Sequence, residues 1–152
     1  MSGNPLLLDT DEAIASLLGE LRRVAVLGIK TEQQRDQPAY YVAADLAARG
    51  VEIVPVPVYY PEAREILGRP VYRRLSEIPG PVDLVNVFRR PADLAAHFDD
   101  LRAKAPRAVW FQLGIRNDEV AQRLTEAGIA VVQDRCLMVE YRNRDQPGRS
   151  RA

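Results

Sequence analysis

The sequence predicts an α/β protein built on a Rossmann-like, doubly wound, parallel five-stranded sheet with helices on both faces. Three observations predict this class: short apolar runs recur along the chain, amphipathic segments with helical spacing separate them, and a glycine ends the first run. Continuous apolar strands are typical of a parallel sheet that is covered on both faces. With right-handed crossovers, the expected strand order is 3-2-1-4-5. The chain of 152 residues is expected to form one domain, 1–152.

The first expected strand, Arg23–Leu27, is the run around which the rest of the chain is organised. A basic residue leads into four apolar residues, and Gly28 then stops the run. A strand, a glycine turn and a following helix form the phosphate-binding corner of doubly wound sheets, where turn N–H groups and the positive helix end face one crevice. The later expected strands are Val51–Val56, Val82–Phe88, Arg107–Phe111 and Ile129–Val132.

Helices are expected between these strands, because apolar residues there recur on one side of a helix. Asp9 is expected to cap the first helix, with Glu12 at the capping-box position, and Gly50 suits the end of the second. Pro91 suits the first turn of the helix that follows the third strand. The expected helical segments are Asp9–Leu21, Ala39–Arg49, Ser76–Pro79, Arg90–Leu101, Asn117–Ala127 and Cys136–Tyr141, and the tail 143–152 is expected to fray.

The composition narrows the class of partner. Lys and Arg together number 21, as do Asp and Glu, and this balance argues against nucleic acid or a membrane surface as the partner. The single cysteine, Cys136, excludes an internal disulfide and favours a reducing compartment. The N-terminus has no basic and apolar signal pattern, and no apolar run approaches the ~18 residues of a membrane span. A cytoplasmic protein is therefore expected.

A ligand is expected beyond the carboxyl ends of the strands, where the order of a doubly wound sheet reverses. Five short segments follow the expected strands at this edge. They combine apolar residues, exposed backbone and a few cations, which suits a nucleotide with phosphate groups. The segments are Gly28–Thr31, Val56–Tyr60, Val87–Arg90, Phe111–Ile115 and Asp134–Leu137.

Motifs for common catalytic chemistries are absent from the sequence. There is no P-loop lysine motif, no nucleophile elbow and no cysteine or histidine spacing for a metal. The dinucleotide fingerprint needs two further glycines after Gly28, which disfavours NAD(P). The only histidine, His97, is expected to be an ordinary surface or half-buried residue, and Trp110 a core residue.

Several runs, in order, resemble a known family. They are Val24–Gly28, Glu65–Tyr72, Val82–Pro91, Ala108–Ile115 and Asp134–Leu137. The chain from Val24 to Tyr141 resembles the small, free-standing CoA-binding proteins of bacteria and archaea. These are similar to the N-terminal CoA-binding domain of the succinyl-CoA synthetase α subunit. The resemblance implies a Rossmann-type domain that binds coenzyme A or an acyl-CoA.

The resemblance also implies which residues bind the ligand. The first turn would hold phosphates, the second would lie near the adenine nucleotide, and the last would lie close to the thiol end of CoA. Ile29 and Lys30 replace the small residue and serine usual in the family, and Lys30 or Arg35 would supply the charge that the second turn lacks. The implied residues are Gly28, Ile29, Lys30, Thr31, Arg35, Pro57, Tyr59, Val87, Phe88, Arg89, Gln112, Leu113, Gly114, Arg135 and Cys136.

The first functional hypothesis is a CoA-binding module that carries out no chemistry, because the phosphorylated histidine and ATP-grasp partner of the synthetase are not encoded here. One alternative is a thiol-redox role for Cys136, which competes with the interpretation that Cys136 is a small buried residue without reactivity. Another is an interaction with a protein partner through the loop Pro57–Pro70. Binding of another nucleotide such as NAD(P) is a further alternative. A homo-oligomer or a protein partner stays open.

Overall fold

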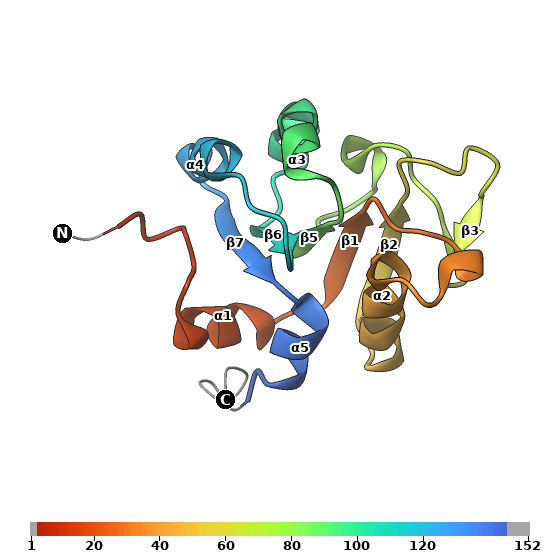
Figure 1. The fold of residues 1–152 in the computed structure, drawn as a ribbon, viewed down its shortest axis with the longest axis horizontal. Helices are drawn as coiled ribbons and strands as arrows, with labels where there is room; N and C mark the ends of the chain where they lie inside the picture. Colours follow the sequence, from red (N-terminus) through yellow and green to blue (C-terminus); the bar gives the residue numbers. More distant parts are fainter. Residues whose placement is uncertain (1–2, 146–152) are drawn as a thin grey trace.

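The computed structural model describes residues 3–145, which form a parallel sheet in the order β2-β1-β5-β6-β7. Its strands are β1 (Arg23–Leu27), β2 (Glu52–Val56), β5 (Leu84–Val87), β6 (Ala108–Gln112) and β7 (Ala130–Arg135). Each neighbouring pair is parallel. The Rossmann-like class with a five-stranded parallel sheet is confirmed (Figure 1).

The strand order requires one correction. The strand expected third, Val82–Phe88, was placed outside the second strand, but β5 lies between β1 and β6. The outer side of β2 is taken by a short antiparallel hairpin, β3 (Glu65–Ile66) and β4 (Arg69–Pro70), after which Tyr72 N–H donates to Pro55 O over 3.0 Å. Numbered along the chain, the five strands lie in the order 2-1-3-4-5; counting the hairpin as the third element gives 3-2-1-4-5-6, which contains the expected order and adds β7 at the far edge.

Helices cover both faces of the sheet, as expected (Figure 1). One face packs against α1 (Asp11–Leu18), α2 (Pro38–Ala48) and α5 (Leu137–Arg142). The other packs against α3 (Phe98–Lys104) and α4 (Asp118–Glu126). Successive β1 residues alternate between these two cores, since side chains alternate along a strand. Trp110 is fully buried, as expected.

Three short 3₁₀ helices occur in the described residues, and two of them lie where helical segments were expected. The segment expected as one helix from Arg90 begins as the 3₁₀ helix η3 (Pro91–His97) and becomes α-helical only in α3. The others are η1 (Glu32–Gln34) and η2 (Leu75–Glu77). Thr10, rather than Asp9, caps α1, because its side chain accepts from Ala13 N–H.

The two ends of the described chain make further hydrogen bonds with the fold. Leu8 N–H donates to Val131 O, and Val131 N–H donates to Leu6 O, each over 2.8 Å, so the N-terminal segment covers the edge of β7. Asn143 N–H donates to Val139 O and continues the hydrogen bonding of α5. The remainder of the tail expected to fray, 146–152, lies outside the described residues. No helix within residues 3–145 is long and apolar enough to span a bilayer.

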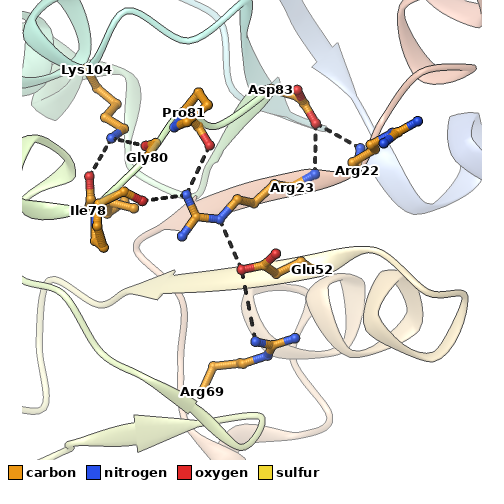
Figure 2. A network of polar contacts seen from close by, with 10 residues as sticks. Arg22, Arg23, Glu52, Arg69, Ile78, Gly80, Pro81, Asp83 and Lys104 are labelled. Atoms are coloured by element: carbon orange, nitrogen blue, oxygen red, sulfur yellow. Dashed lines mark hydrogen bonds and ion pairs between the residues drawn. The ribbon is translucent and has the colours of Figure 1, made fainter.

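Polar contacts tie together the amino ends of the strands, as Figure 2 shows. Arg23 donates from Nε to Glu52 over 3.0 Å and from Nη1 to the carbonyls of Pro79 and Pro81. Lys104 donates to Ile78 O and Gly80 O, each over 2.6 Å. This network fixes the loop before β5, at the end of the sheet opposite the strand carboxyl ends.

Candidate functional site

A cavity of about 660 Å³ lies at the carboxyl ends of β1, β5 and β6. The sheet order places the switch point between β1 and β5, because the connection after β1 leads to one side and β5 lies on the other. The cavity thus occupies the position where doubly wound sheets bind ligands. Its lining consists of Gly28, Lys30, Ala39, Tyr59, Phe88, Arg89, Arg90, Pro91, Gly114 and Ile115.

Gly28 allows the loops after β1 and β5 to meet at the floor of this cavity. Its φ of +87° is a conformation that side chains rarely adopt, and a Cβ there would lie 2.3 Å from Phe88 O. Phe88 N–H in turn donates to Leu27 O over 2.9 Å. Only glycine fits this close approach.

Three backbone N–H groups of the first turn donate to other groups of the protein. Gly28 N–H donates to Val56 O over 2.8 Å, and Lys30 N–H donates to Ala39 O over 3.0 Å. Thr31 N–H donates to Gln34 Oε1 over 3.1 Å. An anion in the cavity would therefore rely on side chains and on the helix that follows.

Lys30 and the start of α2 supply positive charge on the β1 side of the cavity. Lys30 Nζ donates to Gln37 Oε1. Gln37 occupies the N-cap position of α2, and within the described residues its side chain makes no capping hydrogen bond. Ala39, in the first turn, lines the cavity. The positive end of the α2 dipole thus opens toward the site.

Arg89 supplies positive charge from the β5 side, and its side chain is held on several sides. Nε lies 3.1 Å from His97 Nε2, Nη1 lies 3.4 Å from the Tyr59 hydroxyl, and the guanidinium carbon is 5.6 Å from the Tyr59 ring centroid. Nη2 lies 3.6 Å from Asp93, and the side chain is only 15% exposed. Arg89 is therefore a fixed cation rather than a mobile surface charge.

Arg90 differs, because 82% of its side chain is exposed. Its Nε donates to Asp93 Oδ2 over 2.9 Å. This hydrogen bond, together with the positive charges of Arg90 and Arg89, lowers the pKa of the Asp93 carboxyl despite an opposing effect of desolvation. Lys30, Arg89 and Arg90 still outweigh the single carboxylate, so this part of the site favours an anion.

Six of the residues implied by the resemblance meet in this cavity. Ala39, Arg90, Pro91 and Ile115 were not among them. Arg90 and Ile115 lie in the segments selected from the topology, so strand-end position was the signal that could have found them. The six are Gly28, Lys30, Tyr59, Phe88, Arg89 and Gly114.

Other implied residues have buried side chains that do not line this cavity. Ile29 and Val87 belong to the cores, with 1% and 0% exposure, and Pro57 is buried. Gln112 is 4% exposed, and its Oε1 accepts from Asn86 Nδ2 over 3.2 Å and from Leu137 N–H over 3.3 Å. Gln112 thus anchors the start of α5.

The remaining implied residues of the first and fourth turns also lie away from the cavity lining. Thr31 forms a capping box with Gln34 at η1, and Arg35 Nε donates to Glu32 O over 2.9 Å. Leu113 is 65% exposed next to Gly114. These side chains shape the neighbouring loops, and none of them lines the cavity that holds Arg89.

Arg135 and Cys136 lie elsewhere. Arg135 Nη1 is 3.4 Å from both Asp11 and Glu140, and Nη2 donates to Asp9 O over 2.9 Å. It lines a separate cavity beside β7 and the N-terminal segment. Cys136 is half-buried at the N-cap of α5 and packs against the core of that face. Within residues 3–145, no cluster of His, Cys, Asp and Glu could hold a metal ion.

Residues 22–142 match the family model described as a CoA binding domain. The chain is 34% identical over 128 residues to protein YneT of Bacillus subtilis (strain 168), covering 84% of this chain and 91% of that protein. A solved structure from Thermus thermophilus is 36% identical with a TM-score of 0.81, covering 90% of this chain and 99% of that one.

A more distant likeness concerns a larger enzyme. The dinucleotide-forming acetyl-coenzyme A synthetase 1 of Ca. Korarchaeum cryptofilum superposes with a TM-score of 0.60 at 16% identity, over 72% of this chain and 25% of that one. At this identity the likeness concerns the fold alone. The matched family model covers the sheet and the strand ends that line the cavity. The chain therefore belongs to the family of CoA binding domains, as its resemblance to small CoA-binding proteins predicted.

Proposed function

We propose that this chain binds coenzyme A or an acyl-CoA in the cavity at the carboxyl ends of β1, β5 and β6, and carries out no chemistry on it. The observation that carries the proposal is the convergence of Lys30, Arg89 and Arg90 with an apolar wall in one cavity at the switch point. The cavity volume of about 660 Å³ falls within the range of small-molecule sites. Membership of the CoA binding domain family supports the choice of ligand.

The charges and apolar surfaces suggest how the ligand lies. The phosphates lie between Lys30, Arg89 and the start of α2, where fixed positive charge gathers. The ring of Tyr59, which is 62% exposed, offers a face for the adenine. Phe88 and Ile115 provide apolar surface for the pantetheine arm.

The side chains of the cavity favour binding over catalysis. Within the described part of the chain, the cavity lining has no cysteine, serine, histidine or carboxylate. Lys30 is hydrogen-bonded to Gln37, and Cys136 packs against the core instead of lining this cavity. This arrangement supports the binding role over the thiol-redox alternative. The proposal also includes a small-molecule ligand as the partner and the cytoplasm as the location of the protein.

Titration calorimetry with CoA tests the proposal, supported by native mass spectrometry for ligand that copurifies. Arg89→Ala is expected to weaken CoA binding about ten- to a hundredfold, because one charge-assisted contact contributes ~1.5–3 kcal/mol. Lys30→Ala is expected to weaken it by a similar factor. Arg107→Ala is the matched control, since Arg107 lies at the opposite end of the sheet in an exposed ion pair with Glu20.

Two results would count against the proposal. Failure of wild-type protein to bind CoA at millimolar concentration would remove it altogether. Unchanged affinity in both Lys30→Ala and Arg89→Ala would put the phosphate site elsewhere. Competition with NADP distinguishes the other nucleotide: displacement of CoA by NADP at lower concentration would make a dinucleotide the better ligand.

A further inference from the structure

His97 lies directly behind the cation that the cavity presents from β5. Its Nε2 is 3.1 Å from Arg89 Nε. Arginine Nε carries a proton at all physiological pH values, so it donates and the imidazole nitrogen must accept. The imidazole is therefore neutral in this arrangement, with its proton on Nδ1. His97 itself is not part of the cavity lining.

The local fold brings the two side chains together. Arg89 follows β5 directly, and η3 returns the chain so that His97 stands at its last position. Asp93, in the same 3₁₀ helix, lies 3.6 Å from Arg89 Nη2. Tyr59 approaches Nη1 from the loop after β2. His97 thus fixes the Nε edge of the guanidinium, while Tyr59 and Asp93 contact its other nitrogens.

The surroundings of His97 keep its ring neutral. Burial lowers the pKa of His97, and the positive charge of Arg89 lowers it further. The carboxylates of Asp100 on α3 and Asp93 on η3 act in the opposite direction. Asp100 is itself engaged, since it accepts from the N–H groups of Leu75 and Ser76. The tyrosine that faces this cluster, Tyr59, contacts Arg89 instead.

We propose that His97 is a positioning residue for an anionic ligand: its neutral imidazole accepts from Arg89 and holds the guanidinium toward the phosphates of CoA. This inference rests on the proposed function and adds a residue that the ligand does not touch. Protonation replaces the acceptor by a second cationic donor, so the Arg89 contact breaks and the guanidinium loses its fixed orientation.

The first test uses ligand-free protein. Nitrogen NMR of the imidazole is expected to show an unprotonated Nε2 and a protonated Nδ1 for His97, and a slowly exchanging Arg89 Nε–H. His97→Phe keeps a planar aromatic ring but removes the acceptor, so the Arg89 Nε–H is expected to exchange faster. An Nε2-protonated tautomer in the wild-type protein would overturn the inference whatever the protein binds.

The second test measures binding. His97→Phe is expected to weaken CoA binding about tenfold, whereas His97→Gln, whose amide oxygen can accept from Arg89, is expected to stay within about threefold of wild type. Pantetheine, which lacks the phosphates, is expected to bind all three proteins alike. In acid, wild type is expected to lose CoA affinity relative to His97→Gln measured at the same pH, which cancels the titration of the ligand itself.

The outcomes separate the two proposals. Wild-type protein that fails to bind CoA contradicts the proposed function, while the NMR measurement still decides whether His97 holds Arg89. Wild-type protein that binds CoA as tightly as His97→Phe contradicts the positioning role alone. Equal losses of CoA and pantetheine affinity in His97→Phe would indicate a general packing defect and would likewise overturn it.

Discussion

At Gly28, directly after β1, the backbone passes close to the carbonyl of Phe88. Several glycines in the described part of the chain have positive φ, but Gly28 is the one where an added Cβ would meet backbone at 2.3 Å. At Gly128 the φ is +85°, and no atom lies within 4 Å of such a Cβ. Comparing Gly28 with Gly128 therefore separates the free-energy cost of the positive φ from the cost of the close contact with Phe88 O.

Gly28→Ala is expected to lower stability more than Gly128→Ala. The left-handed conformation costs each variant ~1–2 kcal/mol, and only Gly28→Ala adds the clash with Phe88 O. Thermal unfolding measures the difference, at ~2–4 °C per kcal/mol for a chain of about this size. Equal Tm values in the two variants would show that the β1 and β5 loops can move apart freely.

Gln112 illustrates how a residue at a strand end can be structural. The sequence placed it at the ligand, but its amide oxygen accepts from Asn86 and from Leu137 N–H inside the core. The Asn86 Oδ1 atom is buried and, among the described residues, has no partner of its own. The Asn86 side chain is therefore held through its Nδ2, which donates to Gln112 Oε1 over 3.2 Å and to Trp110 O over 3.5 Å.

Gln112→Ala is expected to destabilise the fold by ~1–3 kcal/mol, because a buried donor at the start of α5 loses its acceptor. Leu113→Ala is the neighbouring control, with an expected effect within ~0.5 kcal/mol, since Leu113 is 65% exposed. Urea unfolding of both variants measures these differences. A larger loss in Leu113→Ala would reverse the assignment of the structural role.

Among the elements, the long connection after β2 is ordered by hydrogen bonds from one arginine side chain. Arg73 donates to the carbonyls of Tyr59, Tyr60, Pro61 and Ala63. Glu32 Oε2 also accepts from Leu67 N–H over 2.8 Å and ties η1 to the hairpin β3–β4. The loop that carries Tyr59 to the cavity is thereby organised by a guanidinium behind it.

Arg73→Met is expected to loosen this loop, because the carbonyls lose a shared donor. Limited proteolysis is expected to cut the segment between β2 and β3 several-fold faster, with a smaller decrease in CoA affinity through Tyr59. Arg64→Met changes an arginine of the same segment that does not hold these carbonyls, and its cleavage rate is expected to match wild type. Equal cleavage of both variants would mean that Arg73 does not organise the loop.

For the whole molecule, the lowered pKa of His97 links folding to pH. In the unfolded chain His97 takes up a proton near its ordinary pKa of 6.5, whereas in the folded protein its pKa is lower and it stays neutral to more acidic pH. The stability contributed by neutral His97 is therefore fully present above about pH 6.5 and is lost as the pH falls through the lower pKa of the folded state.

Urea unfolding across about pH 5 to 8 checks this linkage. Wild-type protein is expected to lose stability on acidification more steeply than His97→Gln, which has no titrating group at this position. Since all other titrating groups are shared, the difference between the two curves isolates His97. Parallel curves would show that the pKa of His97 is the same in the folded and unfolded states.

The sequence by itself determined the α/β class, the sheet strands to within a few residues, and the family. Continuous apolar runs can only be buried on both faces, and that requirement follows from local pattern alone. The same reasoning found the strand-end segments that contain Lys30, Tyr59 and Arg89. The strand order could not be predicted in the same way, because the local pattern does not show whether β5 or the hairpin β3–β4 lies beside β2.

Only the tertiary structure decided which strand-end residues line the cavity at the switch point. Successive side chains of a strand point to opposite faces, so Val87 is buried in the core beneath α3 and α4, whereas its neighbour Phe88 lines the cavity. The contact of Arg89 with His97 likewise arises from how η3 folds back after β5. Such contacts depend on the relative placement of whole elements, which the residue pattern of any one element does not contain.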